Sequence, residues 1–172
     1  MRTLFILLIA SVTAMAFTSS ELKPVDANEA VTFTIKNFGI NTNGELKGIR
    51  GTIKWDAANP AASVFNITVD ANTINTGIDM RDNHLRKDEY LDVEKYPSIS
   101  FVSTAVTANN VKGDLTIKGV TKQISFPFTV NLSASGYVFE GSFSINRRDF
   151  GVGGGSVSLS NNVNVNLKVQ AK

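Results

Sequence analysis

The 172 residues carry 17 Lys and Arg against 15 Asp and Glu, and they include no cysteine. This near balance of charge, without a basic stripe, argues against a nucleic-acid partner. The absence of cysteine excludes disulfide cross-links, so the fold must be stabilised by buried apolar surface, for which this length is enough to build one core.

The first sixteen residues have the three parts of a secretory signal peptide. Arg2 gives a basic start, residues 4–10 are continuously apolar, and Ala14-Met15-Ala16 is a small-x-small cleavage motif. The apolar run is much shorter than the roughly 20 residues of a membrane span. We therefore expect residues 1–16 to be a signal peptide, residues 17–172 to form a single domain without an integral membrane span, and the location to be periplasmic or secreted.

Most of the remaining chain alternates apolar and polar residues with period two, which places successive side chains on opposite faces of a sheet. The eight alternating segments are 31–36, 49–55, 65–71, 99–105, 111–117, 124–132, 137–145 and 163–170. Turn-forming pairs are expected to separate them at Asn43-Gly44, Asn59-Pro60, Asn109-Asn110, Ser135-Gly136 and Asn161-Asn162. This pattern predicts an all-β, eight-stranded antiparallel up-and-down barrel, although a two-sheet sandwich fits the same periodicity.

Residues 78–96 interrupt the alternation and are rich in helix-forming residues. We expect Asp79 to cap one short helix over residues 81–90, between the third and fourth predicted strands. Pro97 is expected to end the segment. A helix in this position would cover one mouth of the barrel.

Five residues of this segment are candidates for the lid and mouth of the barrel: Arg81, His84, Leu85, Tyr90 and Leu91. Arg81 and His84 could donate hydrogen bonds to a lipid head group. Alternatively, Arg81 pairs with a nearby carboxylate and His84 anchors the helix to the barrel rim, and we favour this structural role.

The apolar faces are expected to point inward. Membrane barrels carry Trp and Tyr girdles that face lipid, whereas this chain has 11 Phe against three Tyr and one Trp, and lysines lie on the polar faces. Glycines at 51, 113 and 141 are expected to leave space on the inward face. Since an eight-stranded barrel either fills its interior or holds one small ligand, the periodicity leaves both possibilities open.

The sequence predicts neither catalysis nor metal binding. His84 is the single histidine, and no nucleophile elbow or phosphate-binding loop is present. The acidic residues between 79 and 94 lack the spacing of a calcium loop. We therefore expect no catalytic residues, no metal and no cofactor.

Several motifs resemble those of the YceI-like family: Phe33-Thr-Ile-Lys-Asn-Phe-Gly39, Arg81-Asp-Asn-His-Leu85, Asp92-Val-Glu-Lys-Tyr-Pro97, Gly113-Asp-Leu-Thr-Ile-Lys-Gly-Val-Thr121 and Arg147-x-Asp-Phe-Gly151. Their order and spacing agree over residues 25–169. The resemblance implies a lipocalin-like eight-stranded barrel with a helix, a polyisoprenoid in its interior and a periplasmic or secreted location. Asn37 stands where the family usually has His, and Tyr90-Leu91 where it usually has two Phe, so a histidine's role at 37 does not carry over.

We therefore expect non-catalytic binding of a long apolar lipid, a polyisoprenoid, for carriage, storage or sequestration in the cell envelope. The expected apolar wall is Phe33, Ile35, Ile53, Phe65, Ile67, Phe101, Leu115, Phe126, Phe128 and Phe143. Transient membrane contact and a homodimer are compatible with this function. The alternatives are a packed barrel that acts as a stress-related structural or protein-interaction module, and a lipid-modifying enzyme in which Arg81, Asp82 and His84 converge.

Overall fold

The computed structural model describes residues 21–172, and the expected signal peptide over residues 1–16 lies outside them. The strands are β1 (Glu21–Leu22), β2 (Val31–Asn37), β3 (Ile40–Lys54), β4 (Val64–Asn75), β5 (Ser98–Val106), β6 (Asn110–Ile117), β7 (Val120–Ser133), β8 (Gly136–Asn146) and β9 (Leu159–Ala171). The helical elements are α1 (Asp79–Leu85) and the short 3-10 turns η1 (Pro60–Ala62) and η2 (Arg147–Phe150).

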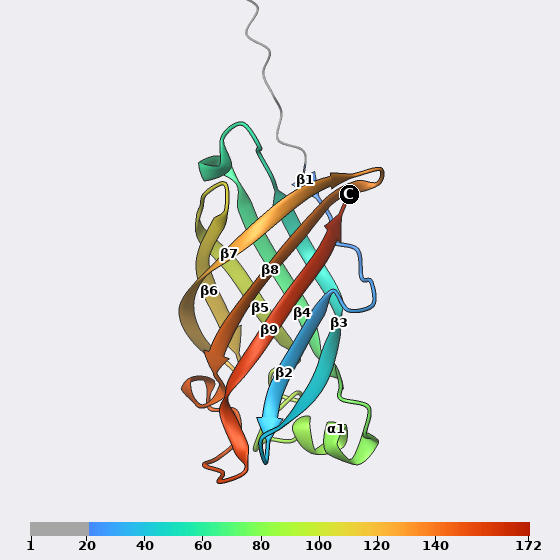
Figure 1. Cartoon of the computed structure of the whole chain (residues 1–172), viewed down its shortest axis with the longest axis vertical. Helices are drawn as coiled ribbons and strands as arrows, with labels where there is room; N and C mark the ends of the chain where they lie inside the picture. The colour runs from blue at the N-terminus through green and yellow to red at the C-terminus, as the bar shows by residue number, and fades with distance from the viewer. Residues whose placement is uncertain (1–20) are drawn as a thin grey trace, which may run out of the picture.

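Strands β2 to β9 form one closed antiparallel barrel in chain order (Figure 1). Each strand pairs with the next one along the chain, and the pairing of β2 with β9 closes the ring. The two residues of β1 add to the end of β3. The predicted up-and-down barrel is confirmed, the sandwich is excluded, and each of the eight predicted segments corresponds in order to one strand from β2 to β9.

The two ends of the barrel carry different connections. Residues 38–39, 76–97, 118–119 and 147–158 connect strands at the end that holds α1, called here the α1 end. The remaining connections, β1 and the C-terminus lie at the opposite end, called here the far end (Figure 1). The predicted position of the helix, between the third and fourth strands of the barrel, is confirmed.

The two tight hairpins at the α1 end use left-handed residues. Phe38 and Gly39 have φ of 49° and 77°, and Lys118 and Gly119 have φ of 50° and 74°. Two successive positive φ values are typical of the type I′ turn, whose twist matches that of the flanking strands. Gly, Asn and Asp are the residues usually found there, so Phe38 and Lys118 are unusual in the first position.

Two of the predicted turns are wrong. Asn43-Gly44 lies inside β3, where the Asn43 amide oxygen accepts a hydrogen bond from the Thr34 hydroxyl of β2 at 2.8 Å. Asn161-Asn162 lies inside β9, where Asn162 pairs with Asn146 at the end of β8. The chain turns before both pairs, at residues 38–39 and over 147–158. The other three predicted turns fall at strand connections.

The helix is shorter than predicted, and Asp79 is its first residue instead of its cap. Arg86 follows the helix and donates from Nε and Nη2 to the backbone oxygens of Asn72 and Ile74, at 2.7 and 2.9 Å. These bonds attach the chain to β4, and residues 87–96 then form turns. The predicted extension to residue 90 is therefore wrong, because tertiary contacts outweigh the helix propensity of this stretch.

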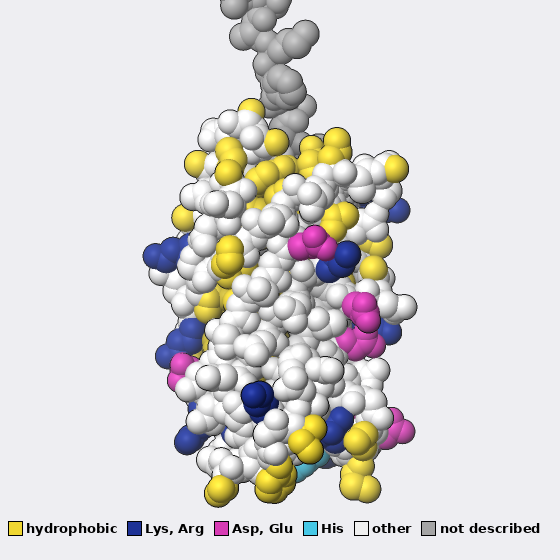
Figure 2. Space-filling view, in the orientation of Figure 1, with side chains coloured by type: hydrophobic (Ala, Val, Ile, Leu, Met, Phe, Trp, Pro, Cys, Tyr) yellow, Lys and Arg dark blue, Asp and Glu magenta, His cyan; other side chains and the backbone are white. Residues whose placement is uncertain are grey.

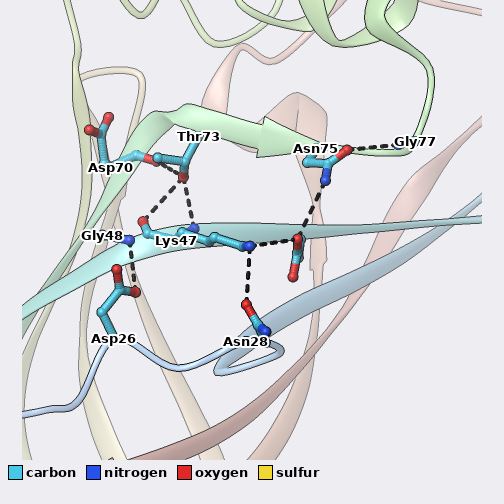
Figure 3. Close-up of polar contacts among 9 residues, drawn as sticks. Asp26, Asn28, Lys47, Gly48, Asp70, Thr73, Asn75 and Gly77 are labelled. Atoms are coloured by element: carbon cyan, nitrogen blue, oxygen red, sulfur yellow. Dashed lines mark hydrogen bonds and ion pairs between the residues drawn. The ribbon is translucent and has the colours of Figure 1, made fainter.

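The pairing of β3 with β4 is irregular near the α1 end. β4 bulges over residues 71–74, so the ladder to β3 is interrupted there. The Thr73 hydroxyl accepts a hydrogen bond from the N–H of Lys47 at 2.8 Å, and the Asp26 carboxylate accepts one from the N–H of Gly48 at 2.9 Å (Figure 3). Side chains thus replace the missing ladder bonds, and the barrel stays closed at this seam.

Candidate ligand-binding cavity

The inward faces of the strands enclose a cavity of about 440 Å³. This volume lies within the range of about 300–1,000 Å³ that small-molecule sites occupy. Several inward-facing apolar side chains, among them Phe33, Phe101, Phe143 and Val165, pack against the core on one side and line the cavity on the other, so they are only half-buried. The barrel is therefore hollow, and the Phe-rich faces do not interlock into a solid core.

An aromatic cluster closes the cavity at the far end. The rings of Phe65 and Phe139 meet edge to face with centroids 5.4 Å apart, and Trp55 packs against Phe128 and Phe139 at 5.8 and 5.9 Å. Phe65, Phe128 and Phe139 are buried. Edge-to-face contacts of this kind add to the stabilisation from burial alone, so the cavity has a rigid apolar floor.

The inward glycines do not leave space as expected. A Cβ at Gly113 would lie 2.5 Å from the ring of Phe101, and one at Gly141 would lie 3.3 Å from the ring of Phe126. The aromatic rings occupy this space themselves. Gly51 has φ of 128° and lies against the backbone of β4, so it serves strand pairing. Since aromatic side chains cover the glycines of the wall, the cavity arises from the diameter of the barrel and not from the glycines.

The structure brings the predicted site residues to one cavity. All ten predicted wall residues line it: Phe33, Ile35, Ile53, Phe65, Ile67, Phe101, Leu115, Phe126, Phe128 and Phe143. The five predicted lid and mouth residues line it too: Arg81, His84, Leu85, Tyr90 and Leu91. Their contact with a lipid belongs to the proposal below.

The site prediction omitted one wall. Side chains of β9 also line the cavity, namely Val163, Val165, Leu167 and Val169. Their alternation with asparagines and lysine along β9 is as regular as that of the other strands. The same period-two rule would have included them.

Lys118 ties three segments of the α1 end together. Its ammonium donates to the backbone oxygens of Asp88, Gly151 and Glu89, at 2.6, 2.9 and 3.3 Å. The N–H of Gly153 also donates to the backbone oxygen of Glu89, at 2.8 Å. Since an ammonium has three donors, all the donors of Lys118 are occupied. Lys118 is therefore a clamp that joins the β6–β7 turn to residues 88–89, in the segment from α1 to β5 called here the lid, and to the loop before β9.

Replacing Lys118 with Met is expected to loosen the lid while leaving the barrel folded. Three carbonyls lose their charged donor, and because the site is partly exposed we expect the free energy of unfolding to fall by about 1–2 kcal/mol. Hydrogen exchange of the amides of residues 89–91 should become faster. Lys122→Met, on the exposed face of the neighbouring strand, is the control. Unchanged exchange in the Lys118 variant would contradict the clamp.

Arg81 holds the start of the lid through Thr76. Its Nε donates to the Thr76 hydroxyl and its Nη2 to the Thr76 backbone oxygen, both at 2.7 Å. The buried Asp82 carboxylate accepts from the N–H of Thr76 at 2.9 Å and from its hydroxyl. The expected pairing of Arg81 with a carboxylate is therefore wrong, because Thr76, directly after β4, supplies both acceptors.

The polar and aromatic contacts of His84 are made with Glu89 and Tyr90, in the turns that follow α1. Its Nε2 lies 3.4 Å from a carboxylate oxygen of Glu89, and its ring packs edge-on against Tyr90 with centroids 5.0 Å apart. Within residues 21–172, no serine or threonine hydroxyl contacts this ring. The described chain also holds no group of three His, Cys, Asp or Glu side chains suited to a metal ion. The geometry here supports positioning, with no assembled nucleophile and base.

Arg147 is a cavity residue that sequence reasoning missed. Its side chain is 4% exposed, and it donates from Nε, Nη1 and Nη2 to the backbone oxygens of Ser160, Val152 and Gly154, at 2.9, 2.7 and 3.1 Å. In the part of the chain that the structure describes, it forms no ion pair with a carboxylate. The guanidinium therefore organises the loop before β9 through carbonyl dipoles. Arg147 belongs to the last of the family motifs quoted above, but its composition gives no sign that the guanidinium is buried.

The described residues contain no helix with the length and apolar character needed to cross a membrane. Charged side chains lie on the outside of the barrel (Figure 2).

The sequence and structure comparisons point to one family and one fold. The model of the YceI-like domain matches residues 22–171. A UPF0312 protein of Pseudomonas savastanoi pv. phaseolicola is 38% identical over 136 residues, which cover 72% of this chain and 71% of that protein. The crystal structure of Burkholderia cenocepacia BcnA matches with a TM-score of 0.76 at 27% identity, over 81% of this chain and 93% of BcnA. A polyisoprenoid binding domain from Saccharophagus degradans, implicated in plant cell wall breakdown, matches in fold with a TM-score of 0.66 at 16% identity, over 88% and 97% of the two chains.

Proposed function

This chain belongs to the YceI-like family, and we propose that its barrel binds one long apolar lipid, a polyisoprenoid, and carries out no chemistry on it. The observation that carries the proposal is the hollow interior of about 440 Å³ with a predominantly apolar lining. The Saccharophagus degradans domain, which is named for polyisoprenoid binding, has the same fold. A packed interaction module would have no use for such a cavity.

Desolvation of hydrocarbon is sufficient to drive binding. Large ligands gain about −0.3 kcal/mol for each heavy atom, so a chain with roughly thirty buried atoms reaches about −9 kcal/mol, a Kd near 0.3 µM. The polar groups of the cavity are not needed for this affinity. They set the direction in which the lipid enters.

The polarity of the lining defines that direction. The far end is floored by the aromatic cluster, whereas the α1 end supplies the hydroxyls of Thr42, Thr76, Ser156 and Ser158 and the guanidinium of Arg81. Because a polar group is costly to bury without a partner, the lipid lies with its apolar tail toward the floor and its polar end at the α1 mouth.

The cellular role that fits these features is carriage, storage or sequestration of the lipid in the cell envelope. Residues 1–16 have the composition of a signal peptide, so we propose a periplasmic or secreted location. A carrier outside the cytoplasm needs only to shield the hydrocarbon from water. This role requires no turnover, consistent with the absence of an assembled catalytic group among the described residues.

Mass spectrometry of an organic extract from natively purified protein tests the ligand class. The expected result is a stoichiometric prenyl chain with a defined number of repeats. Extracts that contain only a broad mixture of membrane phospholipids at substoichiometric amounts would contradict the proposal. Protein unfolded and refolded without lipid, extracted in parallel, controls for carry-over.

Filling the cavity is expected to remove the lipid without unfolding the barrel. Val165 of β9 is half-buried and faces the cavity, so the indole of Val165→Trp occupies space that the lipid needs. We expect bound lipid to fall at least tenfold in the extract, with an unchanged circular dichroism spectrum. Asn164→Trp, one residue earlier on the exposed face, is the matched control. Equal lipid in the two variants would exclude this cavity as the binding site.

A further inference from the structure

Exposed apolar side chains surround the α1 end of the barrel. Phe38 is 81% exposed, Ile40 73% and Met80 82%, and Ile78 and Val157 are exposed as well. They come from three separate connections, the β2–β3 turn, the start of α1 and the loop before β9. Figure 2 shows hydrophobic side chains projecting from this end of the molecule. These five side chains are called the rim.

The rim is continuous with the cavity. Phe38, Met80 and Val157 are each a direct sequence neighbour of residues that line the cavity. Those lining neighbours are Asn37, Arg81, Ser156 and Ser158. The N–H of Phe38 donates to the backbone oxygen of Ser158 at 2.8 Å, so two of the three segments are joined directly. The projecting side chains therefore lie on the segments that line the cavity at its α1 end.

Phe38 is costly to the protein where it stands. It occupies a left-handed position with φ of 49°, which strains a bulky residue, and its ring is mostly in water. Lys118 occupies the same position in the other type I′ turn, but its side chain forms three hydrogen bonds. Within the described chain, the exposed ring of Phe38 makes no comparable stabilising contact. A residue that breaks local rules without an internal gain points to a contact outside the protein.

We propose that the rim inserts into the surface of a lipid bilayer and seats the mouth of the cavity against the membrane. This inference rests on the proposed function, because a lipid that leaves the bilayer through a seated mouth never crosses water. Isolated side chains on turn tips fit the soft interface of a bilayer, whereas a stable protein partner needs a continuous face of about 800 Å².

The charges near the rim are mixed. Four acidic and two basic side chains are exposed around it, namely Asp79, Asp88, Glu89, Asp149, Lys87 and Arg148. This net negative charge gives no attraction to anionic lipids, so apolar insertion provides the binding. Docking should accordingly occur on zwitterionic bilayers and depend weakly on salt.

Vesicle flotation with rim variants tests the inference. The probes are vesicles of phosphatidylcholine alone and of phosphatidylcholine mixed with phosphatidylglycerol. The rim variant Phe38→Asn/Met80→Gln/Val157→Ser should bind both at least tenfold more weakly than the natural chain. Phe38→Asn alone should weaken binding severalfold and raise the Tm, because Asn suits a left-handed turn position. Leu132→Thr, which removes a 77% exposed leucine at the far end, should bind as the natural chain does.

Four results would overturn the inference. The first is that the natural chain floats with neither vesicle, and the second is that the rim variant floats as well as the natural chain. The third is binding that requires phosphatidylglycerol and disappears in salt. The fourth is that the natural chain forms a dimer in solution and the rim variant does not. The proposed function fails separately. If the natural chain docks through the rim but its extract holds no prenyl lipid, only that proposal is wrong. Val165→Trp should still float with vesicles although it lacks lipid.

Discussion

Replacing Phe126 with Asp is expected to abolish lipid retention and to lower the free energy of unfolding by more than about 4 kcal/mol at pH 8. The Phe126 ring is buried in the wall, with ring centroids 4.8 Å from Phe143 and 5.6 Å from Phe101. The substitution removes these contacts and places a carboxylate among hydrocarbon. Denaturant unfolding measures the first effect, and mass spectrometry of the extract measures the second.

The pH dependence separates charge from lost packing in this variant. Burial raises the pKa of the introduced carboxyl in the folded state above its unfolded value of about 3.9. The folded state then binds more protons, so the destabilisation relative to the natural chain is smallest below pH 4 and grows as the pH rises toward the folded pKa. Phe126→Leu, which keeps an apolar side chain, should cost about 1–2 kcal/mol at every pH. A folded Phe126→Asp protein that still carries the same lipid would show that Phe126 does not face the ligand.

Replacing Arg147 with Met is expected to cost about 3 kcal/mol of unfolding free energy. Met keeps much of the length of the side chain, but the backbone oxygens of Val152, Gly154 and Ser160 lose a charged donor. Because no carboxylate partner is left behind, the cost comes from these carbonyls and from the loop that they fix. Hydrogen exchange should quicken across residues 151–158.

The conservative variant distinguishes geometry from charge at this position. Arg147→Lys keeps the charge but cannot direct donors toward three separated carbonyls, so it should recover less than half of the lost stability. Equal stability of the Lys variant and the natural chain would show that the charge alone matters. Unchanged exchange in the Met variant would show that the loop is ordered by other contacts.

Strand number, strand order and the inward faces could be predicted because one physical rule governs all of them. A residue and the residue two positions later lie on one face of a sheet, and one apolar face must be buried. Phe126 and Phe128 therefore had to point inward together, as did Phe65 and Ile67. The rule fails only where the register shifts, and the shifts in β2, between Ile35 and Asn37, and in β5, between Ser103 and Ala105, come after the predicted wall residues of those strands.

Turns and polar contacts could not be predicted in the same way. Phe38 carries no turn signal, so the β2–β3 hairpin was expected at Asn43-Gly44, where a favourable residue pair instead lies in a strand. The end of α1 depends on Arg86 reaching back to carbonyls of β4, which no local pattern reports. The burial of Arg147 likewise depends on carbonyls that meet only after the barrel has closed.

β9 lies between β2 and β8, so the barrel is a ring whose last segment in chain order joins both open edges. Before it docks, an almost complete sheet presents two unpaired borders and an uncovered Phe-rich face, the combination most prone to aggregation. Docking β9 requires the first and last strands of the ring to meet. These strands are far apart in the sequence, so the entropic cost of closing the loop between them is large. The cavity is therefore enclosed only when β9 has paired with both β2 and β8.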